Sequence, residues 1–291
     1  MDNNKIIAHF GAEFHEKVIA GLQRYATKWH LSNFEQIDYY SLSCLFTCDS
    51  AKYGGCVLKF ARFLEIAETE YYMLKDFNGN GLCKVYESDI NNGVLLIERI
   101  MPGVQLCEEP DQNIRINEFC ALAQKLHKPP TDISRYPTYM DWLDNITDFI
   151  KTQTDYADLY HKTQRAKEIC RSLWAKYTDR LLLHGDLHHE NILRGKEGYY
   201  AIDPIGVIGD PVFEIPTFIL EEIDFDVAGE FDYVVGAVSA KCNLPEQDIR
   251  ALLFVESCRL NCCAVEDGDY DEVDMNETLF VERMMGCEHI T

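Results

Sequence analysis

Hydrophobic residues in the first hundred positions change from a helical to a strand-like spacing. Over residues 9–30 they recur three or four positions apart, which predicts one amphipathic helix. Two predicted β-hairpins follow, each a pair of apolar segments around a turn: 41–50 with 54–60, and 83–88 with 93–100. A helix over residues 65–76 lies between them. We therefore expect a small antiparallel sheet with one inserted helix.

Beyond residue 103 the spacing becomes mostly helical. One predicted helix has its apolar face between Ile114 and Leu126 and ends before Pro129. Further helices are predicted over residues 140–150 and 156–177. The change of pattern predicts an α+β fold with a small β-rich lobe, a hinge and a larger, mainly helical lobe. Their predicted ranges are 1–98, 99–103 and 104–291.

Composition favours a cytoplasmic globular protein. The apolar fraction of 47% is ordinary for a folded chain of 291 residues. The first residues, MDNNKIIAHF, lack the apolar block of a secretory signal, and no segment has the apolar length of a membrane span. The twelve cysteines are scattered without a CxxC pair, so we expect reduced packing residues rather than disulfides or a zinc site.

The net charge of -22 is uneven and argues against a nucleic-acid partner, since phosphate backbones require basic surfaces. Residues 1–98 carry 9 basic and 13 acidic side chains, a net of -4, which leaves -18 for the rest. Within the rest, residues 214–277 hold 17 acidic and three basic side chains, a net of -14. A solvated surface explains any single acid, but the group would attract a cationic small molecule.

The segment LLLHGDLHHENIL, residues 181–193, places a polar loop between two apolar strands. Phosphoryl transfer requires a carboxylate that orients and deprotonates the attacking hydroxyl, and oxygen ligands for Mg²⁺. The loop offers Asp186 and, five positions later, Asn191, and Asp203 follows at the end of the next predicted strand. A tight turn at 195–198 would bring the loop close to Asp203. The same order of Asp, Asn and Asp occurs in protein kinases.

HGDLHHEN, followed by AIDPIGVIGDP, resembles the aminoglycoside phosphotransferase branch of the protein-kinase-like fold. Within that branch it is similar to the streptomycin 6-phosphotransferase, or aminoglycoside/hydroxyurea resistance kinase, group. The resemblance implies a two-lobed kinase-like enzyme that uses ATP or GTP. It implies Asp186 as the base and Asn191 and Asp203 as the Mg²⁺ ligands. His188 occupies the place of a kinase lysine and would help neutralise the transferred phosphate.

The same resemblance assigns the nucleotide to the first lobe. Lys59, at the end of VLKF, would bind the α- and β-phosphates. Its partner carboxylate would be Glu70, with Glu68 left as an alternative. Backbone groups from Glu98 to Ile100 would meet the adenine edge.

Three loop positions receive secondary interpretations. His184 is expected to pack and form hydrogen bonds, whereas His189 has no assigned role and is expected at the surface. Glu214 stands where the family commonly has Asp, and it would support the loop.

Two rival classes use the same residues. A metallohydrolase would need His184, Asp186, His188, His189 and Asp203, but H-x-D-x-H-H differs from the H-x-H-x-D-H order of metallo-β-lactamases. A catalytically silent nucleotide-binding protein would be expected to lack a base or a metal ligand, and this sequence lacks neither.

The acceptor is inferred only from charge. A cationic, streptomycin-like substrate would meet carboxylates of the second lobe, with Glu256, Glu266 and Asp267 as the main candidates. Further candidates are Glu221, Glu222, Asp224 and Asp226. The alternative is a housekeeping kinase that acts on a sugar or an amino alcohol. The sequence identifies neither the hydroxyl that is modified nor the oligomeric state.

Overall fold

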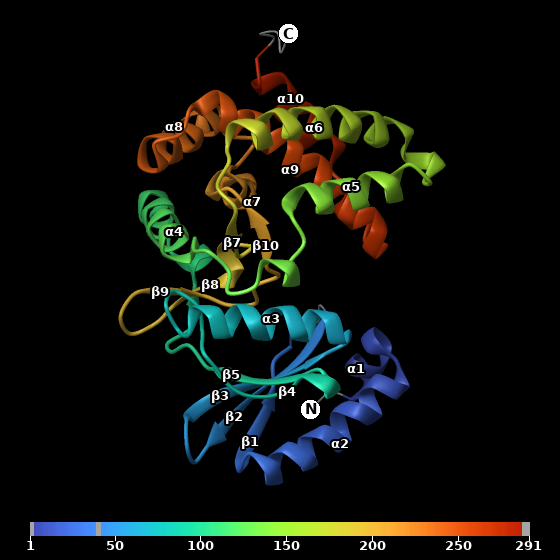
Figure 1. The fold of residues 1–291 in the computed structure, drawn as a ribbon, viewed down its shortest axis with the longest axis vertical. Helices are drawn as coiled ribbons and strands as arrows, with labels where there is room; N and C mark the ends of the chain where they lie inside the picture. The colour runs from blue at the N-terminus through green and yellow to red at the C-terminus, as the bar shows by residue number, and fades with distance from the viewer. Residues whose placement is uncertain (1–2, 39–41, 287–291) are drawn as a thin grey trace. The chain divides into compact units, whose positions relative to one another are not determined.

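The computed structural model describes residues 3–38 and 42–286, which form two compact units (Figure 1). The first unit contains the chain up to Val104 together with Leu193–Ile205, and the second contains Gln105–Ile192 and the chain from Gly206 onward. Leu193–Ile205 thus packs with the first unit, although the sequence pattern groups it with the second predicted lobe. Residue 41 of the first predicted hairpin and residues 287–291 of that lobe lie outside the described residues.

A five-stranded antiparallel sheet forms the centre of the first unit, in the order β1-β2-β3-β5-β4. The strands are β1 (Leu31–Gln36), β2 (Ser43–Ser50), β3 (Gly54–Ala61), β4 (Val85–Asp89) and β5 (Val94–Glu98). The two predicted hairpins are confirmed as β2–β3 and β4–β5. β1 adds an edge strand that pairs with β2.

Helices cover both faces of this sheet. α1 (Asn3–Phe10) and α2 (Ala12–Lys28) pack on one face, and α3 (Leu64–Phe77) lies along the other (Figure 1). The inserted helix is thereby confirmed as α3. The helix predicted over residues 9–30 is confirmed as α2, but it begins only at Ala12, because Gly11, with φ of +88°, separates it from α1. A left-handed residue cannot continue a right-handed helix, and glycine adopts that conformation at no steric cost.

Alternation along β3 decides which side chains reach each helical layer. Leu58 and Phe60 belong to the apolar core that the sheet shares with α1 and α2. Lys59 lies between them in sequence, so its side chain projects from the opposite face. There its Nζ lies 2.8 Å from Glu70 Oε2 on α3. Because side chains alternate between the two faces of a strand, Lys59 lies in the layer between the sheet and α3.

The segment that returns to the first unit is a short hairpin, as predicted. Its strands are β8 (Ile192–Arg194) and β9 (Tyr199–Ala201), and the chain enters the second unit through β6 (Val104–Gln105). The Gly195 N–H donates a 2.7 Å hydrogen bond to the Gly198 carbonyl and closes the turn. The Ala201 N–H bonds to the Gly81 carbonyl at 2.8 Å, which fixes the end of β9. Asp203 follows two residues later.

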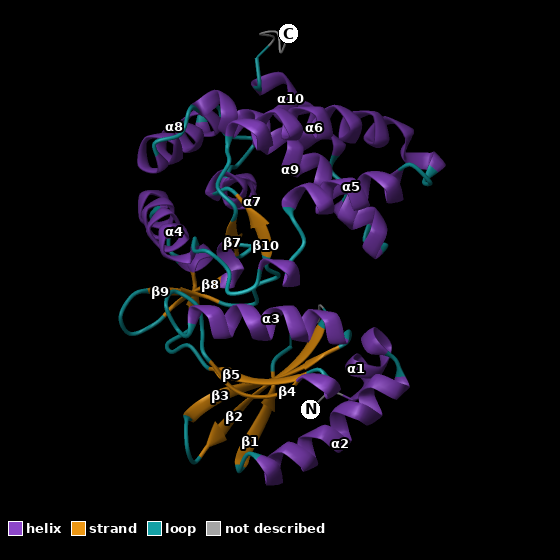
Figure 2. Ribbon diagram, in the orientation of Figure 1, coloured by secondary structure: helices purple, strands orange, loops and turns teal. Residues whose placement is uncertain are grey.

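The second unit is mainly helical (Figure 2). Its helices are α4 (Gln112–Leu126), α5 (Tyr139–Ile150), α6 (Ala157–Lys176), α7 (Ile215–Glu222), α8 (Glu230–Cys242), α9 (Glu246–Asp267) and α10 (Met275–Met284). α4, α5 and α6 confirm the helices predicted there. α9 contacts α5, α6, α7, α8 and α10, and its buried residues lie all round its surface. That distribution is typical of a central helix.

Two short strands carry the polar loop into this helical unit. β7 (Leu181–Leu183) pairs antiparallel with β10 (Val207–Gly209), with Leu183 opposite Val207. The Gly206 N–H donates to the His184 carbonyl at 2.9 Å and extends the pairing by one step. The loop that begins at His184 therefore starts from a fixed backbone position.

Cysteine side chains serve mainly as apolar packing groups in the described parts of the chain. They are free there, and Cys56, Cys170 and Cys258 are fully buried. No helix within residues 3–38 and 42–286 combines the length and the hydropathy needed to cross a bilayer.

Candidate active site

A buried lysine with two carboxylates lies in the first unit. Lys59 Nζ is 2.8 Å from Glu70 Oε2 and also forms a salt bridge with Asp203. The side chains of Lys59 and Glu70 are 3% and 1% exposed, whereas that of Asp203 is 40% exposed. Although burial acts to lower it, the two carboxylates raise the pKa of Lys59 above its usual value. Lys59 is therefore held as a cation beside a solvent-accessible carboxylate.

The structure resolves the choice between two glutamates of α3. Glu70 faces the sheet and pairs with Lys59, whereas Glu68, two residues earlier, is exposed. Positions two apart on a helix point to different faces, so only one of the two can reach the lysine. Burial raises the pKa of Glu70 to about 7 against the attraction of Lys59.

Asp203 adopts a backbone conformation that is uncommon outside glycine. Its φ is +57°, in the left-handed region. Such conformations cost on the order of 1–3 kcal/mol and gather at ligand sites. The position two residues beyond β9 thus presents a carboxylate from a strained turn, next to the cationic Lys59.

Glu98 and Ile100 lie where β5 leaves the sheet. The Glu98 side chain is occupied, because its Oε2 accepts a 3.1 Å hydrogen bond from the Lys84 N–H. Ile100 is buried. Within residues 3–38 and 42–286, no group accepts a hydrogen bond from the Ile100 N–H. That donor is available to a nucleobase, and the contact with adenine stays a prediction.

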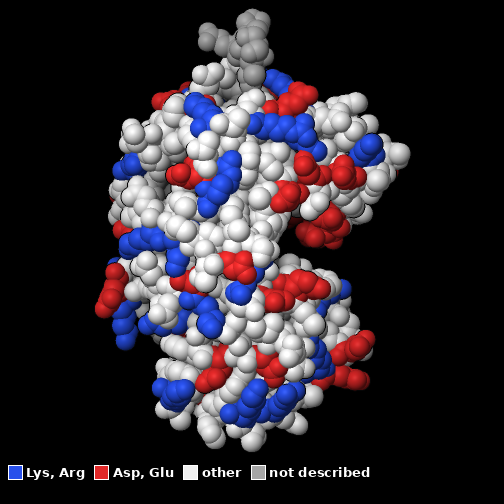
Figure 3. Space-filling view, viewed as in Figure 1, with Lys and Arg blue, Asp and Glu red and all other residues white. Residues whose placement is uncertain are grey.

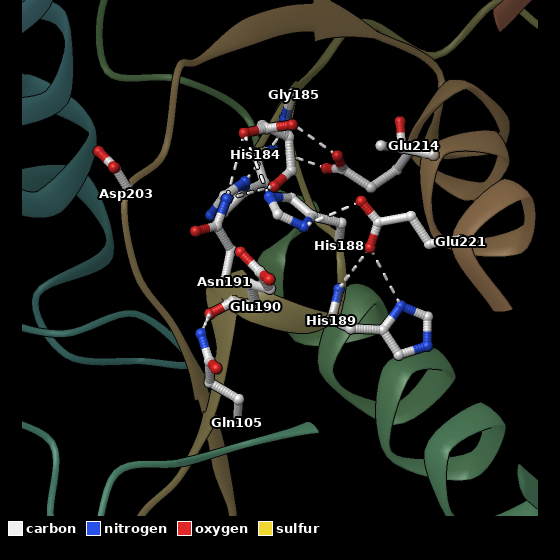
Figure 4. Close-up of polar contacts among 12 residues, drawn as sticks. Gln105, His184, Gly185, His188, His189, Glu190, Asn191, Asp203, Glu214 and Glu221 are labelled. Atoms are coloured by element: carbon white, nitrogen blue, oxygen red, sulfur yellow. Dashed lines mark hydrogen bonds and ion pairs between the residues drawn. The ribbon is translucent and has the colours of Figure 1, made fainter. Parts of the chain in front are cut away.

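In the second unit, the loop after β7 is fixed through its backbone (Figure 4). The buried Glu214 carboxylate accepts hydrogen bonds from the N–H groups of His184, at 2.6 Å, and of Gly185, at 2.9 Å. Gly185 has φ of +85°, and a Cβ there would lie 2.7 Å from Trp142 Cη2. Burial raises the pKa of Glu214 to about 7, opposed by the two backbone donors. Glu214 thus supports the loop, as predicted, although its side chain is longer than that of the Asp that the family commonly has at this position.

Asn191 orients the candidate base. Its Nδ2 donates to the Asp186 carbonyl at 2.9 Å and to Asp186 Oδ2 at 3.1 Å. Because both contacts are made by Nδ2, they fix the orientation of the amide and leave Asn191 Oδ1 out of the contact with Asp186. The buried His184 ring accepts a 3.3 Å hydrogen bond from the Asp186 N–H through Nδ1, as its expected packing and hydrogen-bonding role requires. Asp186 Oδ1 has no hydrogen-bond partner among the described residues.

The two consecutive histidines of the loop both face α7. His188 Nδ1 lies 3.1 Å from Glu221 Oε1, and its Nε2 lies 3.6 Å from Asp186 Oδ2. His189 was expected at the surface, which is wrong: it is buried, with Nδ1 3.3 Å from Glu221 Oε2 and Nε2 2.5 Å from Glu222 Oε2. The reason is the buried carboxylate of Glu222, 33 positions further along the chain, which pairs with the His189 ring.

The electrostatics of this cluster favour charged histidines. Burial acts to lower the pKa of His188, but the carboxylates of Asp186 and Glu221 raise it to about 10. Burial likewise opposes the rise in the pKa of His189 that Glu221 and Glu222 produce. The pKa of Glu221 is held at about 2 by the two histidines, although burial acts to raise it. Glu221 and Glu222, considered as substrate ligands from the sequence, are therefore occupied by the histidines of the polar loop.

The residues present suit Mg²⁺ better than a hydrolytic metal. Mg²⁺ prefers hard oxygen ligands and is usually bound through one or two carboxylates and substrate phosphates. Asn191 Oδ1 and the Asp203 carboxylate are donors of this kind. Across residues 3–38 and 42–286, no group of three or more His, Cys, Asp or Glu side chains is arranged to hold a metal ion. The loop histidines point to glutamates instead, which argues against the metallohydrolase alternative.

Glu256, a predicted substrate contact, is buried inside the second unit at 1% exposure. Arg259 binds its carboxylate through Nε at 2.9 Å and Nη2 at 2.6 Å. The Tyr139 hydroxyl donates to it at 2.6 Å and the Thr217 hydroxyl at 2.9 Å. A cationic substrate would have to displace these partners, so the predicted contact now lacks a free carboxylate.

The other two candidates lie at the exposed end of α9. Burial and Asp267 raise the pKa of Glu266, and burial and Asp269 raise that of Asp267. Acidic and basic side chains are interspersed on the molecular face drawn in Figure 3. Glu266 and Asp267 are therefore exposed acids that remain open to a cation, as are the further candidates Asp224 and Asp226.

Comparison with known proteins identifies the family. The sequence profile described as "Aminoglycoside/hydroxyurea antibiotic resistance kinase" matches residues 28–254, most of the chain. The chain belongs to this family. The match includes the polar loop and both carboxylate partners of Lys59, so the predicted family resemblance is confirmed.

The chain is 32% identical over 168 residues to a streptomycin 3''-kinase from Klebsiella pneumoniae. That match covers 54% of this chain and 58% of the relative. A streptomycin 6-kinase from Streptomyces griseus is 25% identical, over 49% of this chain and 47% of the relative. A hydroxyurea phosphotransferase from Kitasatospora aureofaciens is 28% identical, over 67% and 58%. The matches thus span about half the length of these relatives.

Solved structures support the kinase-like fold of the family. Aminoglycoside phosphotransferase APH(4)-Ia, in a ternary complex with ADP and hygromycin B, aligns with a TM-score of 0.68 at 15% identity. That alignment covers 92% of this chain and 99% of the other. Choline kinase LicA from Streptococcus pneumoniae aligns with a TM-score of 0.66 at 18% identity, over 93% and 96%. The predicted protein-kinase-like α+β fold is confirmed.

Proposed function

We propose that this protein transfers the γ-phosphate of ATP, or of GTP, to a hydroxyl of a small molecule, with Asp186 as the base. The observation that carries the proposal is the Asp186–Asn191 contact. Asn191 and His188 both approach Asp186 Oδ2, which leaves Oδ1 for the proton of an acceptor hydroxyl. The family's kinases and phosphotransferases support the same reaction class.

The proposed reaction needs only positioning and charge from the chain. Asp186 Oδ1 accepts the hydroxyl proton as the hydroxyl oxygen bonds to the γ-phosphorus and the bond to the β-phosphate oxygen breaks, which releases the nucleoside diphosphate. Lys59, fixed by Glu70, binds the phosphates of the nucleotide. Asn191 Oδ1 and Asp203 would hold Mg²⁺, which neutralises phosphate charge when it is bound. His188, held as a cation, adds positive charge beside the base.

For the acceptor, we propose an aminoglycoside of the streptomycin type. Support comes from the named relatives, two of which are streptomycin kinases. A sugar or an amino alcohol is the second candidate. The engagement of Glu256 by Arg259, and of Glu221 and Glu222 by histidines, favours this alternative, because it removes three carboxylates from those available to a polycation.

The test measures nucleotide consumption by the purified chain with Mg²⁺-ATP and a panel of streptomycin, other aminoglycosides, choline and simple sugars. Asp186→Asn should lower kcat by about 10²–10⁴-fold, the usual contribution of a general base, with ATP affinity unchanged by calorimetry. Asp203→Ala should weaken Mg²⁺-dependent ATP binding itself. Near-full turnover by Asp186→Asn would refute the assigned base, and unchanged Mg²⁺-ATP affinity in Asp203→Ala would refute the metal ligand.

A further inference from the structure

The doubled histidine of the catalytic loop faces a doubled glutamate at the end of α7. One carboxylate, that of Glu221, reaches both histidines, with Oε1 3.1 Å from His188 Nδ1 and Oε2 3.3 Å from His189 Nδ1. The same Oε2 lies 3.4 Å from the His189 backbone N–H, which donates to it. Figure 4 shows Glu221 between the two rings. A single side chain thus connects α7 to two consecutive loop residues.

His188 continues this connection to the candidate base. Its Nδ1 makes an ion-pair contact with Glu221 Oε1 at 3.1 Å, and its Nε2 lies 3.6 Å from Asp186 Oδ2. The ring therefore lies between two carboxylates, one on α7 and one on the loop. Because an imidazole is rigid and planar, fixing Nδ1 also fixes where Nε2 points. Glu221 is thus placed where it can influence the orientation of the ring toward Asp186.

The second histidine, His189, and the second glutamate, Glu222, fix the position of α7 relative to the loop. Glu222 accepts hydrogen bonds from Arg115 on α4, through Nε at 2.9 Å and Nη2 at 2.6 Å, and it also contacts His189 Nε2. The His189 ring stacks on Phe218, with 4.4 Å between centroids, and Phe218 stacks on Phe119 of α4. These contacts anchor α7 to α4, so the backbone that carries Glu221 has a fixed position.

We propose that Glu221 is a positioning residue that holds the His188 imidazole against Asp186 Oδ2, so that Oδ1 remains the oxygen available to the acceptor hydroxyl. The inference rests on the proposed kinase function and adds to it a residue outside the HGDLHHEN loop. Glu221 touches neither the base nor the loop asparagine, and it reaches the base through His188, whereas its contacts with His189 hold the loop backbone. The same geometry gives the second member of each pair, His189 and Glu222, a structural task.

The experiment is a double-mutant cycle on steady-state kinetics with Mg²⁺-ATP and streptomycin, or with whichever panel compound is turned over. Glu221→Gln should lower kcat on the order of tenfold to a hundredfold, as loss of a supporting carboxylate does, while KM for ATP stays within about twofold. In the His188→Gln background, Glu221→Gln should have less than about a twofold further effect, because its target is absent. Glu168→Gln, at an exposed position of α6 and with the same charge change, serves as the matched control and should leave kcat unchanged.

The outcomes separate this inference from the proposed function. If Asp186→Asn retains turnover, the proposed function fails. If Asp186→Asn is inactive but Glu221→Gln is fully active, only the positioning role fails. Additive losses from Glu221→Gln and His188→Gln would also overturn it, because they would mean that Glu221 acts independently of His188. If Glu221→Gln folds poorly, Glu221→Asp replaces it in the same double-mutant cycle, because it withdraws the carboxylate by one methylene.

Discussion

The buried ion pair of α9 allows a quantitative prediction. Glu256 is 1% exposed, and two of its four hydrogen bonds come from Arg259, whose side chain is 12% exposed. Arg259→Met keeps a long apolar side chain but removes the charge. The remaining donors, Tyr139 and Thr217, are neutral. The substitution would therefore leave a buried carboxylate without its counter-charge.

The expected loss is large on the scale of single substitutions. Removing one partner of a buried ion pair costs about 3–5 kcal/mol of unfolding free energy. Two charge-assisted hydrogen bonds at about 1.5–3 kcal/mol each give a consistent range. Arg250→Met is the matched control on the same helix. Arg250 pairs with Asp232 and Glu246, whose side chains are 61% and 51% exposed, and such pairs contribute about 1 kcal/mol or less.

The loss should depend on pH. Burial acts to raise the pKa of Glu256, but Arg259 and the hydroxyl donors hold it below its usual value. In the wild-type protein the stability from this group is present above the unfolded pKa and is lost as pH falls through the lower folded pKa. Without Arg259 burial dominates and the folded pKa rises, so stability instead falls as pH increases through that raised pKa. The destabilisation by Arg259→Met should therefore be greater at about pH 8 than at about pH 5.

Urea unfolding followed by far-UV circular dichroism measures these differences. The set comprises the wild type, Arg259→Met, Arg250→Met, and the double variant Glu256→Gln with Arg259→Met. The double variant should regain part of the loss, because a neutral amide replaces the unpaired charge. The reasoning is refuted if Arg259→Met is no less stable than Arg250→Met, or if the double variant is no more stable than Arg259→Met at about pH 8.

Two further substitutions test the loop and the α10 terminus. Gly185→Ala places a Cβ 2.7 Å from Trp142 at a backbone φ of +85°. Because an alanine in that left-handed conformation costs about 1–2 kcal/mol, we expect a lower melting temperature and a reduced kcat. An unchanged melting temperature would contradict this expectation. Burial and Asp274 raise the pKa of Glu277 to about 7, so its stability contribution, complete below the unfolded pKa, is lost as pH rises toward 7. Glu277→Gln should flatten this dependence in urea midpoints, and an unaltered pH slope would count against it.

Local periodicity accounts for much of the fold that the sequence predicts. The hairpins β2–β3 and β4–β5 have alternating segments and turn residues between them, and α5 and α6 have sustained helical spacing. The sequence pattern did not predict the helix break at Gly11, because apolar positions continue with helical spacing on both sides of it. The three-residue strand β10 is too short for any periodicity to register. Its pairing with β7 is a tertiary contact and not a local preference.

The site was predictable where chemistry is local in sequence. Asp186 and Asn191 are five positions apart in one loop, and their contact follows from that motif. The choice of Glu70 over Glu68 needed the orientation of α3 relative to the sheet. The role of His189 needed Glu221 and Glu222, more than thirty positions downstream on another element. No spacing rule connects such residues, because only the packed fold brings them together.

The acidity of residues 214–277 also acquires a different meaning. Its net charge of -14 suggested a surface for a cationic acceptor, yet several of its carboxylates have partners within the protein. Glu214 binds backbone N–H groups of the loop, Glu221 and Glu222 bind histidines, and Glu256 binds Arg259. A cationic acceptor would therefore depend on carboxylates that lack such partners. Glu266 and Asp267 fit this requirement: burial and, after it, repulsion by a neighbouring acid raise the pKa of each, and a bound ammonium group would relieve that repulsion.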